Sequence, residues 1–271
     1  MTGKDIRFSR LFSGGKNAVV VAVDHGEFDG PLPGMLDLPE TVRNIDPSVS
    51  AVLVSPGMLP HCGEAFSVKG APLAMVRLNW STVYAFHWGY NDADTVVAMT
   101  AEDAIKNGAD LALVSLTLKT GSEARDAANV EVFCKLAAEA KRFGIPVVGE
   151  FFPPHSTRLS DEDMLEYVYR SCRILAELGA DCIKTFYTYN FEEVTRSCPV
   201  PILGLGAEKT PKQIQALELA EKIVQGGGKG VVFGRNAIQV NNPAAFQRAL
   251  CDVVQSGKTA ADALRDHELK D

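Results

Sequence analysis

The sequence predicts an α/β protein, a (β/α)8 TIM barrel that forms a single domain over residues 1–271. Eight short apolar runs recur along the chain, and each is followed by a helical pattern. The runs are rich in β-branched residues and continuous rather than alternating, as expected of parallel strands covered on both faces. A chain of 271 residues has the usual length of one such barrel. A doubly wound open sheet is disfavoured because no G-x-G-x-x-G motif follows the first run.

The eight predicted strands have recognisable ends. The first, second and fourth consist of Ala, Val and Leu up to a terminal polar residue, and glycine closes the seventh and the eighth. The tripeptide Gly-Ala-Asp precedes the fourth and the sixth, where glycine suits the left-handed end of a helix. The fifth begins at a proline. The strands cover residues 18–24, 51–55, 73–79, 111–115, 146–151, 182–186, 200–206 and 230–234.

Helices are predicted most clearly in the second half of the chain. The helix over 122–144 ends at Gly144, directly before the next strand. The helix over 160–181 opens with Ser160, three residues before an Asp, which is close to a capping box. The helix over 210–227 opens with Thr-Pro, the pair expected at an N-cap and a first turn.

The composition is that of an ordinary soluble protein, with 46% hydrophobic and 23% charged residues. The net charge of −7 argues against a nucleic acid or an anionic membrane as the main partner. No run reaches the roughly 18 apolar residues of a membrane span, and the N-terminus has no signal-peptide pattern. The six cysteines are scattered without a C-x-x-C pair, which predicts reduced thiols and a cytoplasmic location.

Chemistry in such barrels takes place at the carboxyl ends of the strands, so polar residues there are candidate site residues. Lys184 stands at the end of the sixth strand, within "GADCIKTFYTYN". A buried ammonium is costly, and desolvation lowers the pKa of a lysine from roughly 10.4 toward neutrality. The neutral amine attacks a ketone or an aldehyde and forms an iminium that acts as an electron sink. We therefore predict that Lys184 is the nucleophile.

Three further candidates for catalysis stand at the ends of the first and fifth strands. Asp24 and His25 end the first, in "VDHGEFDGP", and Glu150 ends the fifth, in "GEFFPPH". Asp24 is the predicted acid/base, either in carbinolamine formation or at a substrate hydroxyl. The residues leave alternatives open: Asp24 as a helix cap or loop residue, His25 as a structural hydrogen-bonded side chain, and Lys184 as a snorkelling lysine.

Glycine-rich turns follow the seventh and eighth strands. Gly206 and Ala207 precede Lys209 in "GLGAEK", and Gly234 precedes Arg235 in "FGRN". Barrels commonly bind phosphate at these two turns, on backbone N–H groups and a helix N-terminus. The arginine adds a fork of charged donors. We predict that these five residues bind the phosphate of a small phosphorylated sugar substrate.

The chain resembles the class I aldolases of the archaeal-type fructose-bisphosphate aldolase family, a DeoC/LacD-like group, and especially the branch that contains the autoinducer-2 processing thiolase. The matching stretches are "FSRLF", "VDHGEFDGP", "GADCIKTFY", "CPVPILGLGAEK" and "GVVFGRNAIQ" with "NNP". The resemblance implies a (β/α)8 barrel and homo-oligomers, often decamers. It also implies a Schiff base on Lys184, an acid/base role for Asp24 and phosphate contacts at the two glycine turns.

One position departs from the pattern of that family. Its fructose-bisphosphate aldolases usually carry a Tyr followed by Pro at the end of the fifth strand, where the Tyr serves as proton donor. Here "EFFPP" places Phe152 at that position, and a phenyl ring has no proton to give. Glu150, His155, Tyr187 or a water molecule are the candidate substitutes.

Two classes of enzyme fit these residues. The first is a metal-independent class I aldehyde-lyase, an aldolase that cleaves or forms a C–C bond in a phosphorylated ketose and needs no cofactor beyond the covalent lysine imine. The second is a lysine-dependent thiolase or transferase that acts on a phosphorylated diketone with coenzyme A. A metal-dependent aldolase is disfavoured because the five histidines are dispersed. A non-catalytic barrel that binds a sugar phosphate would not need both Lys184 and Asp24.

Overall fold

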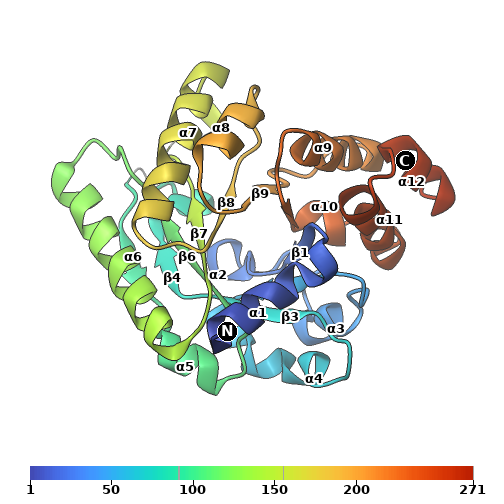
Figure 1. Ribbon diagram of the computed structural model, residues 1–271, viewed down its shortest axis with the longest axis horizontal. Helices are drawn as coiled ribbons and strands as arrows, with labels where there is room; N and C mark the ends of the chain where they lie inside the picture. Colours follow the sequence, from blue (N-terminus) through green and yellow to red (C-terminus); the bar gives the residue numbers. More distant parts are fainter. Residues whose placement is uncertain (91, 155, 271) are drawn as a thin grey trace.

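Eight parallel strands close into a barrel in a computed structural model that describes residues 1–90, 92–154 and 156–270 (Figure 1). The strand order around the barrel is β1-β10-β9-β8-β7-β6-β3-β2, so each strand pairs in parallel with its neighbours in the chain and the ends meet at β1 and β10. The predicted fold is therefore confirmed. The strands are β1 Ala18–Ala22, β2 Ala51–Val54, β3 Leu73–Arg77, β6 Leu111–Leu116, β7 Val147–Phe151, β8 Cys182–Thr185, β9 Ile202–Leu205 and β10 Gly230–Phe233.

Helices surround the barrel, with α6 and α7 on one side and α9, α11 and α12 on the other (Figure 1). The long helices follow their strands and pack against them, as α6 packs on β6 and α7 on β7 and β8. The α-helices are α1 Gly3–Leu11, α2 Gly26–Asp29, α3 Leu38–Arg43, α4 Gly63–Phe66, α5 Ala101–Lys106, α6 Glu123–Phe143, α7 Asp161–Glu177, α8 Phe191–Ser197, α9 Gln213–Gln225, α10 Arg235–Ile238, α11 Pro243–Ser256 and α12 Ala260–Asp266.

The predicted helix ends are correct at two positions and wrong at one. Gly144 ends α6 in a left-handed conformation with φ of 67°, and the Ser160 hydroxyl accepts a hydrogen bond from the third backbone N–H of α7. Thr210 does not cap a helix, because α9 begins at Gln213. The backbone N–H of Thr210 instead donates to Oδ1 of Asn236, which holds the Thr-Pro pair in the loop after β9.

The third predicted strand is shorter than expected. β3 ends at Arg77, and Asn79–Ser81 form a separate strand, β4, that pairs antiparallel with β5, Thr95–Val97. The amide of Asn79 explains the break, because it donates to the carbonyl of Ser115 and accepts from the N–H of the same residue. These bonds tie the chain to β6 and direct the segment between β4 and β5 over the barrel mouth.

Apolar side chains at alternating strand positions fill the barrel interior. Met75 of β3, Val148 of β7 and Cys182 of β8 belong to this interior cluster, which Leu11 of α1 closes from below. Because side chains alternate between the two faces of a strand, the residues two positions further along also face the interior. Those residues are Arg77, Glu150 and Lys184. A polar layer therefore lies on top of the apolar core, at the carboxyl ends of the strands.

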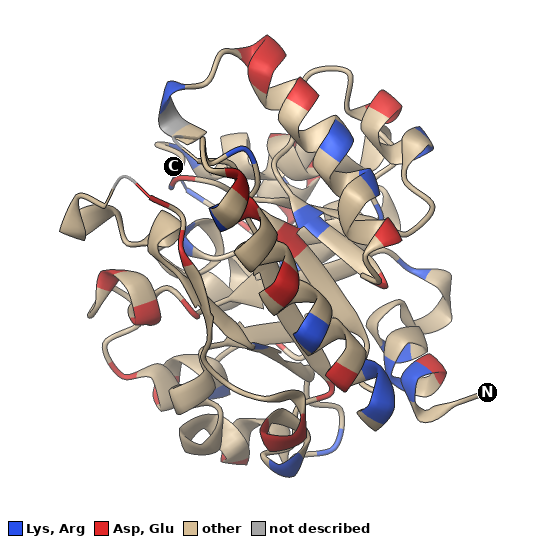
Figure 2. Cartoon of the chain, turned by 90° about the vertical axis from the view of Figure 1, so that its left-hand side faces the viewer, with Lys and Arg blue, Asp and Glu red and all other residues tan. Residues whose placement is uncertain are grey.

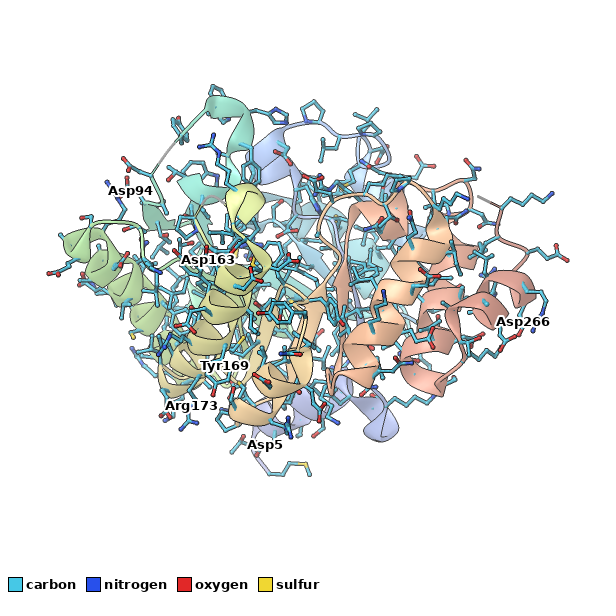
Figure 3. The ribbon with its side chains drawn as sticks, turned by 90° about the horizontal axis from the view of Figure 1, so that it is seen from above. Asp5, Asp94, Asp163, Tyr169, Arg173 and Asp266 are labelled. Carbon is cyan, nitrogen blue, oxygen red and sulfur yellow. The ribbon has the colours of Figure 1, made fainter. Side chains whose placement is uncertain are left out.

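Acidic and basic residues are interspersed along the outer helices, with no single sign dominating the face in view (Figure 2). Arg173 and Tyr169 lie on the outer surface of α7, where Arg173 pairs with Glu177 one turn further on (Figure 3). Among the described residues, no helix combines the length and the hydropathy needed to cross a membrane.

Candidate active site

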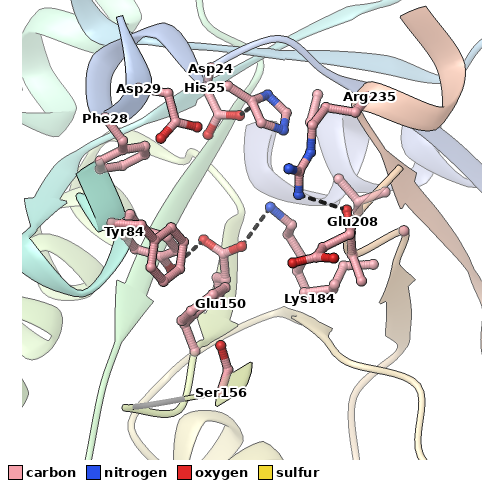
Figure 4. A pocket seen from close by; sticks show the side chains of 18 of the residues that line it. Asp24, His25, Phe28, Asp29, Tyr84, Glu150, Ser156, Lys184, Glu208 and Arg235 are labelled. Carbon is pink, nitrogen blue, oxygen red and sulfur yellow. Dashed lines mark hydrogen bonds and ion pairs between the residues drawn. The ribbon is translucent and has the colours of Figure 1, made fainter. Parts of the chain in front are cut away.

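A cavity of about 770 Å³ opens at the carboxyl ends of the barrel strands (Figure 4). The ends of β1, β3, β7, β8, β9 and β10 all contribute to its wall. It contains the four predicted catalytic residues, Lys184, Asp24, His25 and Glu150. These side chains come from β7, β8 and the turn after β1, so closure of the barrel brings them together.

Lys184 lies on the floor of the cavity and is 7% exposed. Its Nζ is 2.5 Å from Oε1 of Glu150, its neighbour in the β7–β8 register. Burial disfavours the charged form of Glu150, but the guanidinium of Arg77 and the ammonium of Lys184 outweigh it and hold the pKa of Glu150 below its usual value. The ammonium therefore faces an ionised carboxylate, a base within direct reach of its proton.

Arg77 is the central side chain of the polar layer, and sequence analysis missed it. Its guanidinium is 2% exposed, its Nε donates to Oδ2 of Asp24 at 2.8 Å, and its Nη2 lies 2.7 Å from Oε2 of Glu150. Burial opposes the charge of Asp24, yet Arg77 and Lys184 keep the pKa of Asp24 lowered. The sequence did carry a signal for Arg77: it is a charged residue inside an apolar run, two positions after Met75, whose side chain faces the barrel interior.

His25 lies between Asp24 and the turn after β10. Its Nδ1 is 3.9 Å from Oδ1 of Asp24, and burial lowers the pKa of the imidazole, so the ring is neutral at neutral pH. A Cβ atom on Gly234 would lie 2.2 Å from Cε1 of His25 and 2.8 Å from the carbonyl oxygen of Ala22. Only glycine fits at this position, because both neighbours are packed against it.

Tyr84 is a second site residue that sequence analysis missed. It ends a short 3-10 helix, Thr82–Tyr84, in the segment between β4 and β5, and its hydroxyl donates to Oε2 of Glu150 at 2.8 Å. Burial and the charge of Glu150 raise the pKa of the phenol well above its usual value, so the hydroxyl keeps its proton. No local pattern in the sequence identifies a tyrosine in this loop as a site residue.

Glu27 borders the polar layer from α2. Its Oε1 is 3.5 Å from Nε of Arg77, while its two carboxyl oxygens have no hydrogen-bond donor among the described residues. Burial raises the pKa of Glu27 to about 8, against the opposing effect of Arg77. Glu27 is therefore largely protonated at neutral pH, which reduces the negative charge around Arg77.

The two predicted phosphate-binding turns lie side by side. Nη2 of Arg235 donates to the carbonyl of Ala207 at 3.1 Å, and Asn236 donates to the carbonyl of Gly206. Nε of Arg235 is buried without a hydrogen-bond acceptor among the described residues. Gly206, Ala207, Gly234 and Arg235 line the cavity together.

Lys209 does not join them. It is exposed and is absent from the cavity wall, whereas the preceding Glu208 lines it. Asn236 of α10 holds the loop after β9 through the Glu208 carbonyl and the Thr210 N–H. Lys209 therefore lies outside the cavity wall, whereas Arg235 is part of it.

Phe152 lines the cavity, with its ring centroid 4.6 Å from that of Tyr84 and 5.2 Å from that of Phe186. Among the candidate substitutes for a proton donor, Glu150 lies in the site. Tyr187 is not part of the cavity wall and packs against Phe191, while His155 lies outside the described residues. In the described part of the chain, no group of three or more His, Cys, Asp or Glu side chains is arranged to hold a metal ion.

Comparison with known proteins identifies relatives over almost the whole chain. A family model described as DeoC/LacD family aldolase matches residues 18–240. An uncharacterized aldolase of Saccharolobus solfataricus is 32% identical over 98% of this chain and 99% of its own length. A 3-hydroxy-5-phosphonooxypentane-2,4-dione thiolase of Photorhabdus laumondii is 27% identical over 96% of this chain and 85% of its own length. A solved structure of a Schiff-base-forming fructose-1,6-bisphosphate aldolase superposes with a TM-score of 0.77 at 25% identity, covering 93% of this chain and 100% of the other.

Proposed function

Because the chain belongs to the DeoC/LacD aldolase family, we propose that it is a Schiff-base aldolase that cleaves or forms a C–C bond in a phosphorylated ketose. The contact of 2.5 Å between Nζ of Lys184 and Oε1 of Glu150 carries this proposal. It joins the amine of Lys184 on the cavity floor to an ionised carboxylate that is able to take its proton. The similarity to a Schiff-base-forming fructose-1,6-bisphosphate aldolase supports the same chemistry.

Iminium formation begins when Glu150 accepts a proton from the ammonium of Lys184. The free amine adds to the ketone carbon, and its remaining excess proton moves to the carbonyl oxygen to give a carbinolamine. Glu150 then returns its proton to the carbinolamine hydroxyl, which leaves as water, and the nitrogen lone pair completes the iminium. Tyr84 keeps its hydrogen bond to Oε2 throughout and so orients Oε1 toward the reacting nitrogen.

Cleavage of the C–C bond requires a base for the substrate hydroxyl that is β to the iminium carbon. We assign this role to Asp24, which is ionised and held in place by Arg77. When Asp24 takes the hydroxyl proton, the aldehyde carbonyl forms and the bonding electron pair moves to the iminium, which becomes an enamine. Protonation of the enamine carbon and addition of water then release the ketone and regenerate the amine. The reverse sequence forms the bond.

The phosphate of the ketose fits the two glycine turns. Arg235 supplies a charged donor with an unpaired Nε, and Gly206 and Gly234 bring backbone close to the cavity. His25 lies at the same turn, where a neutral imidazole adds a further hydrogen-bonding group. The exposed side chain of Glu208 also lines the cavity at this turn.

A thiolase or transferase acting on a phosphorylated diketone is the second candidate. It is favoured by the thiolases among the relatives and by Phe152, which offers no proton to a sugar hydroxyl. This reaction would use coenzyme A, whereas the aldolase reaction needs no cofactor beyond the covalent lysine imine. Strict dependence of turnover on coenzyme A would select this candidate. For either reaction we propose a cytoplasmic homo-oligomer, and the resemblance to the aldolase family suggests a decamer as one assembly to test.

The decisive test is to incubate the protein with dihydroxyacetone phosphate and borohydride and to map the reduced adduct by peptide mass spectrometry. We expect the adduct on Lys184 and no adduct in Lys184→Met, which fills a similar volume and should stay folded. Lys119 is the internal control, because its ammonium lies over the ring of Tyr167 outside the cavity wall. An adduct on Lys119, or none on the native protein, would contradict the proposal.

A further inference from the structure

Aromatic rings form a continuous wall along one side of the cavity. The ring of Phe28 contacts that of Tyr84 at 4.7 Å between centroids, Tyr84 contacts Phe152 at 4.6 Å, and Phe152 contacts Phe186 at 5.2 Å. Phe86 extends the row toward solvent, 6.2 Å from Phe152, and is 58% exposed. All five rings line the cavity. Such a wall favours an uncharged apolar group over a hydrated one.

This wall and the phosphate-binding turns lie on opposite sides of the reactive amine. Figure 4 shows Phe28 and Tyr84 on one side of Lys184, and Arg235 on the other. A ketose bound with its phosphate at Arg235 and its ketone carbon at Lys184 therefore extends its remaining carbons toward the rings. Those carbons become the aldehyde fragment when the bond breaks.

The charges on the aromatic side do not suit a second phosphate. The guanidinium of Arg77 lies 4.9 Å from the Tyr84 ring centroid, but it is 2% exposed, and its Nε and Nη2 are engaged by the carboxylates of Asp24 and Glu150. Asp29 adds a further carboxylate to this side, 3.6 Å from Nε2 of His87. A phosphate placed here would meet phenyl rings and an acidic side chain, both of which disfavour a buried anion.

From this arrangement, and on the premise that the proposed Schiff-base reaction is correct, we propose that the aldehyde partner is uncharged and carries an apolar substituent of about the size of a ring. In the forward addition, the enamine carbon on Lys184 attacks the aldehyde carbon and a new C–C bond forms. The aldehyde oxygen takes a proton and becomes a hydroxyl, while the enamine becomes an iminium that water hydrolyses. The product is a monophosphorylated ketose with an apolar end.

The test compares aldehydes in aldol addition to dihydroxyacetone phosphate with the native protein. Phenylacetaldehyde, glyceraldehyde and glyceraldehyde 3-phosphate differ in charge and apolar area. We expect kcat/KM to be at least about tenfold higher for phenylacetaldehyde than for glyceraldehyde 3-phosphate, since apolar pockets discriminate roughly 10- to 200-fold. Preference for glyceraldehyde 3-phosphate in the native protein would overturn the inference.

Two variants separate the effect of the wall from the intrinsic reactivity of the aldehydes. Phe86→Arg places a cation at the exposed end of the wall. The ratio of kcat/KM for phenylacetaldehyde to kcat/KM for glyceraldehyde 3-phosphate should fall at least about tenfold in this variant. Tyr169→Ser, an exposed aromatic on the outer face of α7, is the matched control and should leave the ratio unchanged. An unchanged ratio in Phe86→Arg would also overturn the inference.

Borohydride trapping keeps the two proposals distinguishable. If dihydroxyacetone phosphate labels Lys184 but the aldehyde ratio opposes our expectation, the apolar subsite fails and the Schiff-base mechanism stands. If no label forms on Lys184, the proposed function fails first and the inference falls with it.

Discussion

Nη2 of Arg77 lies 2.7 Å from Oε2 of Glu150, and this ion pair leaves the opposite carboxylate oxygen, Oε1, in contact with the ammonium of Lys184. The other side of the same guanidinium holds Asp24 through Nε. Arg77 therefore positions both carboxylates, one of which contacts the reactive amine, although it is not itself required to exchange a proton. The stability and the chemistry of the site both depend on this one buried cation.

Arg77→Met should destabilise the protein strongly, because it removes the guanidinium that pairs with both Asp24 and Glu150 and leaves two buried carboxylates with Lys184 as their one remaining buried cation among the described residues. Breaking a buried ion pair by removing one partner costs roughly 3–5 kcal/mol. The measurement is the free energy of unfolding from denaturant titration. Arg10→Ala is the control, since Arg10 forms an exposed ion pair with Asp110 and should change stability little. Equal effects of the two variants would contradict the positioning role of Arg77.

Glu150→Gln should slow iminium formation by about 10²–10⁴-fold, because the amide keeps the shape of the side chain but cannot accept a proton from the ammonium. The measurement is the rate at which the borohydride-trapped adduct appears with excess dihydroxyacetone phosphate. Tyr84→Phe is a milder comparison that removes one donor to Oε2. Because that hydrogen bond stabilises the carboxylate, its loss should shift the acidic limb of the pH–rate profile upward. Adduct formation at the native rate in Glu150→Gln would exclude this base.

Arg235→Ala should raise KM for phosphorylated ketoses much more than for their unphosphorylated analogues. Losing a charged hydrogen bond costs roughly 1.5–3 kcal/mol, or about ten- to a hundredfold in binding. Lys209→Ala is the matched control, since Lys209 is exposed and outside the cavity wall. We expect a smaller change for Lys209→Ala. Equal losses on both substrate types in Arg235→Ala would rule out a phosphate contact.

Glu27 should make the protein less stable as the pH rises. Its pKa is raised from 4.5 to about 8 in the folded protein, so the folded state binds more protons than the unfolded state between these values. The contribution of Glu27 to the free energy of unfolding therefore falls as the pH increases from about 4.5 to 8. The side chain in Glu27→Gln stays neutral at every pH. The free energy of unfolding of this variant, relative to that of the native protein, should therefore be higher at pH 8 than at pH 5.

The measurement for Glu27 is the free energy of unfolding at the two pH values, with a relative gain of more than about 1 kcal/mol expected. Glu218→Gln on the exposed face of α9 is the control and should show the same pH dependence as the native protein. A Glu27→Gln variant with unchanged pH dependence would mean that the carboxyl group is ionised in the folded state.

The sequence alone determined the eight strands and the residues that stand at their ends. Apolar runs of β-branched residues predicted the barrel, and its closure is confirmed. The strand-end rule placed Lys184, Asp24 and Glu150 in one cavity, because every strand of a parallel barrel ends on the same face. Period-two alternation, counted from Met75, would also have indicated that Arg77 faces the interior.

Only the tertiary structure decided which of these side chains meet. The pairing of Glu150 with Lys184 depends on the register between β7 and β8, which no local pattern encodes. Tyr84 reaches Glu150 from a loop 66 residues earlier in the chain, because the bonds between Asn79 and Ser115 turn that loop over the barrel mouth. Contacts of this kind arise from the packing of distant segments, so no single stretch of the sequence predicts them.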